Sequence, residues 1–230
     1  MAKDTTIISF ATQKGGSGKS TLTHMVALAL IGKEYKKSIL VIDADEQKNL
    51  TKSYARQQKQ NAASPEAAVK TYDLISCLLD DLKNTIKENF GKYDYIFIDL
   101  PGTFMASGVK AAFLYCDIVF VPIKHSQPDI DSSKEVFKLL DEVKKLRKSK
   151  GADFKFYSLI SIAEPDKANY KTFSQYVNSQ SYQCLKNPFN KYVKYENALT
   201  NFTNILDLPK WKHEEEAFNR FFQELYKLIK

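Results

Sequence analysis

A glycine-rich segment near the start of the chain limits the possible folds more than any other feature. Residues 14–21 read KGGSGKST and lie between an apolar β-branched run, TTIISFA, and an apolar helical stretch. Three glycines allow the backbone to curl so that successive N–H groups point at one anion. Lys19 can reach the β- and γ-phosphates of a nucleotide, and the hydroxyl of Ser20 can ligate Mg²⁺. We expect the nucleotide-binding residues to be Lys14, Gly15, Gly16, Ser17, Gly18, Lys19, Ser20 and Thr21.

The segment departs from the usual phosphate-loop pattern G-x-x-x-x-G-K-[ST] at one position. Gln13 stands where the first glycine belongs. An additional lysine, Lys14, lies five residues before Lys19.

Short β-branched runs alternate with longer amphipathic stretches along the chain. A continuous apolar run indicates a parallel strand that is covered on both faces. The alternation predicts an α/β fold with a doubly wound, mostly parallel sheet and helices on both faces. With 230 residues, we expect one domain, 1–230. We expect strands at about 5–11, 38–44, 70–75, 95–100, 117–122 and 154–162, and helices at about 19–31, 47–60, 78–90, 132–150 and 214–229.

Two of the expected strands end in carboxylates. The second strand ends in Asp43 and Asp45, and YIFIDLPG places Asp99 after four apolar residues. Ligands of doubly wound sheets bind at the carboxyl ends of the strands. An acidic pair beside a phosphate loop would be mutually repulsive without a cation. The sequence therefore predicts a magnesium site next to the loop, with Asp99 holding the ion through water.

The motif KGGSGKST resembles the deviant Walker A motif of the ParA/MinD superfamily of ATPases, in which the early lysine is the signature residue. The segment DADEQ is similar to the family's D-x-D-P-Q segment, with Glu46 in place of proline, and YIFIDLPG fits its Walker B strand. The resemblance covers the N-terminal half, through Val121-Pro122. Beyond it only the order of elements, the segment YVKYEN (192–197) and the closing helix agree. The best match is to small ParA (ParF-like) partition proteins that lack an N-terminal helix-turn-helix domain, because the phosphate loop begins at about residue 13.

The resemblance implies a role for each matching residue. Lys14 would reach across a homodimer interface to the partner's ATP, so that ATP is sandwiched between two subunits. Lys14, Lys19 and Asp45 would be catalytic, with Asp45 positioning or activating the attacking water. Ser20, Asp43 and Asp99 would form or support the Mg²⁺ site, and ATP or ADP would be the bound nucleotide.

The chain carries a net charge of +7 and has a sequence pI of about 9.0, which permits binding to any polyanion. Lysine-rich organisms also have basic proteins, so charge alone does not establish DNA binding. The segment KKLRKSK (144–150) is a candidate DNA contact or a helix end stabilised by cations. The other candidates are Lys186, Lys191, Lys194, Lys210 and Lys212.

The family implies a partition function for plasmids or chromosomes. ATP would build a dimer, the dimer would bind DNA nonspecifically, and a centromere-binding adaptor, often of ribbon-helix-helix type, would stimulate slow hydrolysis. We see no signal peptide and expect a cytoplasmic protein, associated with the nucleoid when ATP is bound and without stable membrane association.

Two other functions are compatible with parts of the sequence. A MinD-like membrane-associated ATPase needs a C-terminal amphipathic anchor, and Ala217, Phe218, Phe221, Leu225, Leu228 and Ile229 share one helical face. The alternative is a last core helix, favoured by the acidic start Glu214 to Glu216. A related iron–sulfur protein needs paired cysteines, but Cys77, Cys116 and Cys184 are widely separated and form no CxxC pair. His24, His125 and His213 show no metal-ligand spacing.

Overall fold

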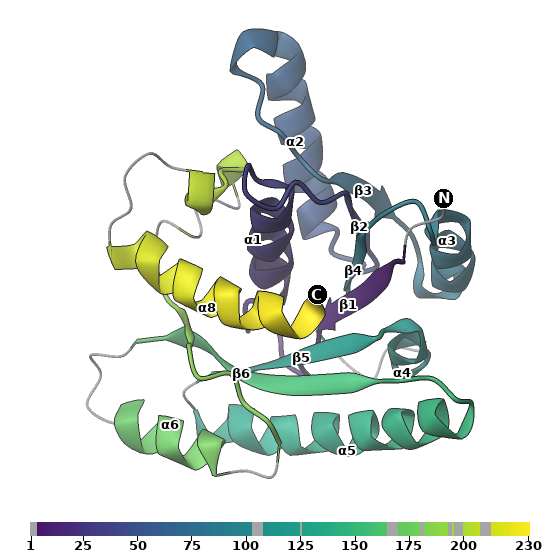
Figure 1. Cartoon of the computed structure of the whole chain (residues 1–230), viewed down its shortest axis with the longest axis vertical. Helices are drawn as coiled ribbons and strands as arrows, with labels where there is room; N and C mark the ends of the chain where they lie inside the picture. The colour runs from purple at the N-terminus through teal and green to yellow at the C-terminus, as the bar shows by residue number, and fades with distance from the viewer. Residues whose placement is uncertain are drawn as a thin grey trace.

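The chain folds around one parallel β-sheet. The computed structural model describes residues 4–102, 108–124, 126–164, 170–179, 182–192, 195, 200–207 and 213–230. The sheet has seven strands in the order β3-β2-β4-β1-β5-β6-β7, and every described pairing between them is parallel (Figure 1). The strands are β1 (Thr6–Phe10), β2 (Ile39–Asp43), β3 (Asp73–Ser76), β4 (Tyr95–Asp99), β5 (Ile118–Ile123), β6 (Lys155–Ala163) and β7 (Phe189–Asn190).

Helices cover both faces of this sheet, as the alternation of elements predicted. Apolar residues of α1, α2 and α8 pack on one face, and those of α3, α4, α5 and α6 pack on the other. The α-helices are α1 (Lys19–Ile31), α2 (Asn49–Ala63), α3 (Leu82–Asn89), α4 (Val109–Ala112), α5 (Gln127–Ser149), α6 (Tyr170–Asn178) and α8 (His213–Ile229). Short 3₁₀ turns are η1 (Pro65–Ala67), η2 (Leu79–Asp81), η3 (Phe113–Tyr115) and η4 (Ile205–Asp207).

Successive side chains of each strand serve opposite faces, since the side-chain period of a strand is two. In β2, Ile39 and Val41 join the α1 side, whereas Leu40 and Ile42 join the α5 side. All five residues of β2 are buried. A continuous apolar run is therefore what this strand requires.

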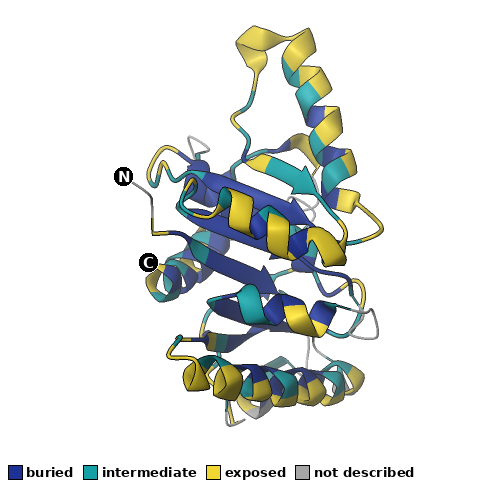
Figure 2. Ribbon diagram, turned by 90° about the vertical axis from the view of Figure 1, so that its right-hand side faces the viewer, coloured by how far each residue is buried: buried dark blue, intermediate teal, exposed yellow. Residues whose placement is uncertain are grey.

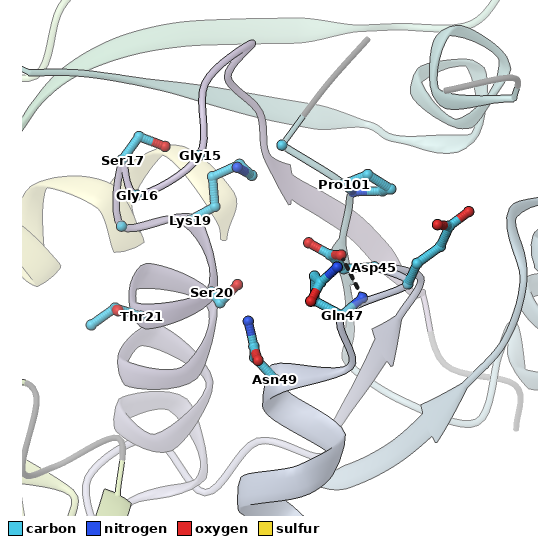
Figure 3. Close-up of a pocket in the computed structure, with 13 residues that line it drawn as sticks. Gly15, Gly16, Ser17, Lys19, Ser20, Thr21, Asp45, Gln47, Asn49 and Pro101 are labelled. Carbon is cyan, nitrogen blue, oxygen red and sulfur yellow. Dashed lines mark hydrogen bonds between the residues drawn. The ribbon is translucent and has the colours of Figure 1, made fainter. Parts of the chain in front are cut away.

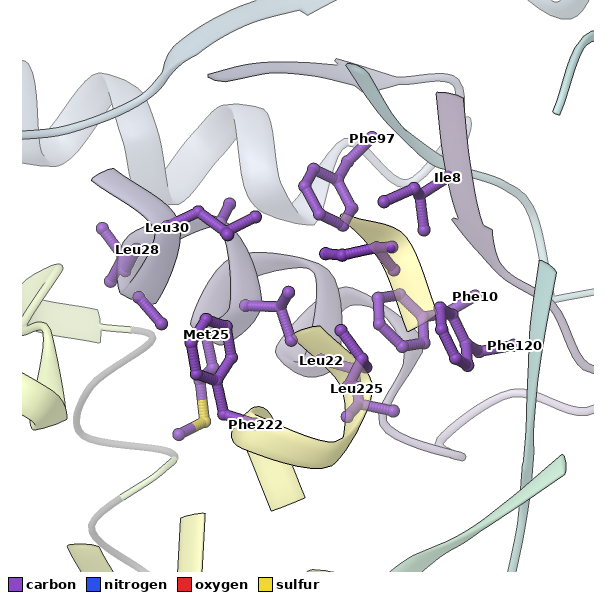
Figure 4. Close-up of a cluster of buried hydrophobic side chains, with 14 of the residues drawn as sticks. Ile8, Phe10, Leu22, Met25, Leu28, Leu30, Phe97, Phe120, Phe222 and Leu225 are labelled. Atoms are coloured by element: carbon purple, nitrogen blue, oxygen red, sulfur yellow. The ribbon is translucent and has the colours of Figure 1, made fainter. Parts of the chain in front are cut away.

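Helix α1 is the centre of the larger core. Its residues from Leu22 to Ile31 are all buried, which fits a helix that is apolar all round and enclosed by protein. Figure 4 shows Leu22 of α1 close to Phe10 of β1, Phe120 of β5 and Leu225 of α8. This enclosed helix begins at the glycine-rich loop, so the loop stands on a rigid support.

Most element positions predicted from the sequence are confirmed within one or two residues, and α1 matches the predicted range. Helix α5 begins earlier than predicted, at Gln127 instead of 132. Ser126 caps it by accepting a hydrogen bond from the backbone N–H of Asp129, and proline is tolerated in the first turn. The single helix predicted at 78–90 is instead the turn η2 followed by the shorter α3.

Helix α2 continues to Ala63, three residues beyond the predicted end at about 60. The Asn61 side chain fastens this end of the helix: its Oδ1 accepts from the Val69 N–H, and its Nδ2 donates to the Val69 carbonyl. The sequence did not predict α4, α6 or the short β7. Most of the YVKYEN segment lies outside the described residues.

The apolar face of α8 is buried in the core. Ala217, Phe218, Phe221, Leu225 and Ile229 are each at most 6% exposed. Leu228, the remaining residue of that face, is partly buried against the same core. This confirms the interpretation of α8 as a last core helix. Among the described helices, none combines the length and apolarity needed to cross a bilayer.

Candidate functional site

The glycine-rich loop connects the carboxyl end of β1 to the amino end of α1. Gly16 and Gly18 have φ angles of +70° and +85°, a backbone region that glycine enters at little cost. Gly18 precedes the helix, and no side chain caps the helix start. The first N–H groups of an α-helix have no partner within it. The loop therefore presents unpaired backbone donors at the positive end of a helix, which favours an anion.

Hydroxyl side chains hold this loop in shape from inside. The Thr12 Oγ1 donates to the Lys14 carbonyl at 2.8 Å and lies 3.0 Å from the Ser17 Oγ. From strand β6, two places along the sheet from β1, the Ser161 Oγ donates to the Ser17 carbonyl at 2.7 Å. Ser161 is fully buried, so this bond joins the loop to the sheet without competition from water.

We expect Ser161→Ala to destabilise the fold by about 1–2 kcal/mol, because the Ser17 carbonyl loses a buried donor. The measurement is urea unfolding, and nucleotide affinity should fall in parallel as the loop loosens. Ser149→Ala is the matched control: its exposed hydroxyl also donates to a backbone carbonyl, that of Leu146, and its loss should change stability by less than about 0.5 kcal/mol. Equal effects of the two variants would contradict the proposed role of Ser161.

A cavity of about 620 Å³ opens beside the loop. Figure 3 shows Lys19 and Ser20 on one side of it, with Asp45, Gln47 and Asn49 opposite. Pro101 and Gly102, after β4, close part of the rim. The lining residues are Gly15, Gly16, Ser17, Gly18, Lys19, Ser20, Thr21, Asp45, Glu46, Gln47, Asn49, Pro101 and Gly102.

Lys19 is a buried cation in this cavity, only 7% exposed. Burial lowers its pKa, and the nearby carboxylates Asp99 and Asp45 partly oppose that shift. Lys124, at the end of β5, lowers the pKa further by repulsion. A desolvated lysine gains most from a multiply charged anion such as a triphosphate.

Asp99 and Ser20 form the second element of the site. The Ser20 Oγ donates to Asp99 Oδ2 at 2.7 Å. Asp99 is fully buried, and burial raises its pKa to about 7; the Ser20 hydrogen bond and Lys19 oppose this, whereas Asp43 and Asp45 add to it. Its other oxygen, Oδ1, is buried without a hydrogen-bond partner. A buried carboxylate oxygen without a partner, beside a hydroxyl, suits a hard cation such as Mg²⁺.

Protein side chains alone do not form a complete metal cage here. Among the described residues no group of three or more His, Cys, Asp and Glu could hold a metal ion. Mg²⁺ usually keeps several waters and is bound through one or two carboxylates plus substrate phosphates. The residues present therefore fit a magnesium ion that arrives with a nucleotide.

Asp43 lies next to Asp99 in the sheet register but faces a different partner. Its Oδ2 accepts from the N–H of Thr51 at 2.9 Å and from the Thr51 hydroxyl at 2.6 Å. Its Oδ1 accepts from the N–H of Asp45 at 3.3 Å. Asp43 thus anchors α2 and the loop after β2, and it does not line the cavity.

The third carboxylate, Asp45, lines the cavity. Its Oδ1 accepts from the Gln47 N–H at 2.9 Å, which fixes the loop that carries it. The structure thus brings Asp45, Lys19 and Ser20 to one cavity, with Asp99 directly behind Ser20.

Lys14 is half-buried and does not line the cavity of its own subunit. Two residues from distant segments, Lys124 and Glu135, lie beside the loop. The Lys124 Nζ is 3.6 Å from where a Cβ on Gly16 would stand. The side chain of Gln13, which replaces the usual glycine, donates to Glu135 of α5 at 3.3 Å. Both approaches join segments more than a hundred residues apart, and no local pattern announces them.

One residue of the basic segment at the end of α5, Arg147, has a structural role. The Arg147 guanidinium donates to the carbonyls of Leu114 and Asp153 and pairs with Asp117 at 2.9 Å. Among the other candidates, Lys191 lies 3.8 Å from Glu164. Lys194, Lys210 and Lys212 are outside the described residues, as is His125.

Comparisons with known proteins agree with this geometry. Residues 5–89 match the AAA_31 family model, an AAA domain, whereas a search of curated sequences gave no match. A Borrelia burgdorferi B31 protein described as a plasmid partition protein, bound to AMPPNP, is similar in structure at 19% identity and TM-score 0.71, covering 98% of this chain and 100% of that one.

Two further solved structures share the fold. An ATP complex of a McdA variant from Cyanothece has 16% identity and a TM-score of 0.66, with 97% of each chain covered. The MinD cell division protein of Aquifex aeolicus has 20% identity and a TM-score of 0.60, with 96% of this chain and 97% of that chain covered. In its phosphate-loop motif, in the match of residues 5–89 to the family model and in its fold, this chain is similar to ParA-family plasmid partition proteins and to MinD.

Proposed function

We propose that this protein is a ParA-type partition ATPase that dimerises with ATP and Mg²⁺, binds DNA nonspecifically and segregates a plasmid or chromosome. The observation that carries the proposal is that the two lysines of the loop are placed differently. Lys19 lines the nucleotide cavity, whereas Lys14, half-buried on the same loop, does not. A lysine that is not used by its own cavity is available to the phosphates of a second subunit.

The roles of the other residues follow from their positions. Lys19 and the N–H groups at the start of α1 would bind the β- and γ-phosphates. Ser20 and Asp99 would hold Mg²⁺, which would neutralise charge on those phosphates. Asp45, which lines the cavity opposite Lys19, would orient the attacking water. Asp43 would act indirectly, by fixing the loop that carries Asp45.

The dimer would depend on nucleotide for an electrostatic reason. Two facing phosphate sites repel each other until lysines and Mg²⁺ neutralise them. Hydrolysis would weaken the interface by removing the γ-phosphate that Lys14 contacts. A centromere-binding adaptor, of ribbon-helix-helix type in the resembling family, would stimulate this step by an arginine finger.

Lys14→Ala is expected to abolish ATP-dependent dimerisation while ATP still binds each monomer. The measurement is molar mass by light scattering with ATP and Mg²⁺, with ADP, and with AMPPNP, and nucleotide affinity is followed separately. Lys83→Ala, which removes an exposed lysine from α3, is the matched control and should dimerise like the wild type. If the wild-type protein stays monomeric with ATP and Mg²⁺ at high protein concentration, the proposed ATP-dependent dimer is refuted.

The DNA component has its own test. Wild-type protein should be retained on an unrelated duplex at low salt with ATP, but much less with ADP or as Lys14→Ala with ATP. Equal retention in all three conditions would rule out a nucleotide switch. The MinD-like alternative is checked with anionic liposomes: nucleotide-dependent sedimentation would favour it, although the burial of the α8 apolar face argues against it.

A further inference from the structure

Helix α2 projects from the body of the molecule. Figure 1 shows its distal turns rising beyond the sheet, and Figure 2 shows that these turns are mostly exposed. Of its residues only Leu50, Ser53 and Gln57 are buried. A polar helix that extends away from the core contributes little to the core, so its exposed face is available to a partner.

The exposed face of α2 carries cations without carboxylates. Lys52, Arg56 and Lys59 fall within an arc of about 60° at 100° per residue and span about 10 Å of the helix axis. Lys48 precedes them at the start of the helix, and all four are exposed. Residues 47–65 contain no Asp or Glu, and in the part of the chain that is described none of the four cations takes part in an ion pair. We call Lys48, Lys52, Arg56 and Lys59 the α2 cationic face.

The basic end of α5 is a weaker candidate for the same role. Five carboxylates lie among the six cations of α5, and Arg147 is already paired with Asp117. Opposite charges on one helix cancel its field at a distance. The α2 cationic face lacks that cancellation.

The chemistry of α2 favours nucleic acid over a membrane. Its exposed residues include Gln60 and the partly exposed Asn61, and the exposed large apolar residues of the described chain, Leu78, Phe90 and Leu146, lie on other elements. Binding to a bilayer surface needs an apolar face that enters the acyl boundary. A polyanion with regularly spaced phosphates needs only the cations and polar donors that α2 presents.

The start of α2 is tied to the nucleotide cavity. Asp43 holds the Thr51 N–H and hydroxyl, and the Lys48 N–H donates to the Asp45 carbonyl at 2.9 Å. Gln47 and Asn49, on either side of Lys48, line the cavity. A nucleotide that orders the loop from Asp45 to Asn49 would therefore also fix the orientation of α2.

We propose that the α2 cationic face is the surface that holds the DNA backbone, and that the loop from Asp45 to Asn49 links it to the nucleotide. This inference rests on the proposed function, because it takes DNA as the ligand. In the ATP-bound dimer two such helices would bind the same DNA, so the dimer would have a much higher DNA affinity than the monomer.

The test is a full-length variant with Lys52→Gln, Arg56→Gln and Lys59→Gln, compared with Lys144→Gln, Lys145→Gln and Lys148→Gln on α5 as the charge-matched control. Affinity for an unrelated duplex with ATP is measured by anisotropy over a range of salt. For the α2 variant, affinity at low salt should fall at least ~10-fold, and the slope of log K against log salt should shrink by about 2–3, because each lost phosphate contact accounts for about 0.9. The α5 variant should change the slope by less than about 1.

Nucleotide affinity, dimerisation and the thermal midpoint of the α2 variant should match the wild type, since the three residues are exposed. The inference is overturned if the α2 variant binds DNA as tightly as the wild type, or if the α5 variant loses more DNA affinity than the α2 variant. Either result leaves the proposed function intact. Failure of the wild type to bind DNA while it still dimerises with ATP refutes the DNA component of the proposed function. Loss of binding to anionic vesicles by the α2 variant, with DNA binding retained, assigns the surface to membranes and also overturns the inference.

Discussion

Lys19→Met should weaken ATP binding by about 10²-fold and reduce hydrolysis by at least as much. The buried ammonium lines the cavity together with Asp45 and is also close to the buried Asp99 carboxylate. A charged hydrogen bond to a phosphate contributes about 1.5–3 kcal/mol. Methionine is unbranched and one atom shorter, so it keeps most of the apolar stem and removes the charge and the N–H donors. The measurement is isothermal titration with AMPPNP and Mg²⁺, together with steady-state phosphate release.

The fold itself should not suffer from this change, because burial already disfavours the charged lysine in the free protein. We expect an unfolding midpoint equal to or slightly above that of the wild type. Lys33→Met, at an exposed position in the turn that follows the same helix, is the control and should leave nucleotide affinity unchanged. If Lys19→Met binds AMPPNP normally, the cavity beside the loop is not the phosphate site.

Asp99→Asn should abolish Mg²⁺-dependent hydrolysis and also change how stability depends on pH. The pKa of Asp99 is raised to about 7 from 3.8, chiefly by burial. The folded state therefore binds this proton more tightly than the unfolded state does. Its contribution to stability is fully present below about pH 4 and is lost as the pH rises through 7.

Nucleotide-free wild type should accordingly lose about 1–3 kcal/mol of unfolding free energy from this group between pH 5 and pH 8. Asp99→Asn lacks the titrating group, so its loss over the same interval should be smaller by that amount. Denaturant unfolding of both proteins at the two pH values gives the comparison, in which the remaining carboxylates cancel. Identical pH dependence in the two proteins would show that Asp99 is not a destabilised buried carboxylate.

Mg²⁺ with nucleotide should restore stability at pH 8 in the wild type, because a ligand that binds only the folded state stabilises it. The asparagine variant should gain much less from Mg²⁺ added to the nucleotide. This result would connect the unpartnered Oδ1 of Asp99 to its function. The nucleotide-free protein would then be less stable at this pH because the buried Asp99 carboxylate lacks the cation that it binds.

The N-terminal half of the fold could be predicted from the sequence because its signals are local. The loop at 14–21 sets the end of one strand and the start of one helix, and α1 matches the predicted range. The buried strands β2 and β4 follow from continuous apolar runs. Lys19, Ser20 and Asp45 could be placed at one cavity because the carboxyl ends of parallel strands meet at one edge of a sheet.

The C-terminal half gave weaker signals. Helix α6 and strand β7 were not predicted, and β7 has only two residues, too few for a period to be counted. The predicted start of α5, at about 132, is wrong by five residues, because Pro128 lies in the first turn of the helix, where proline is tolerated.

By itself, the sequence determined which residues could bind phosphate and in what order the strands and helices follow, because both depend on neighbours along the chain. The tertiary structure alone decided how those residues are used. Sheet burial raises the pKa of Asp99, and Asp117, 30 residues away, pairs with Arg147 in the basic end of α5. Asp43 accepts hydrogen bonds from Thr51 and does not line the cavity. The cations of α2 stay exposed because the distal turns of that helix project from the core. Burial and pairing are set by groups far apart in the chain, so no local pattern can encode them.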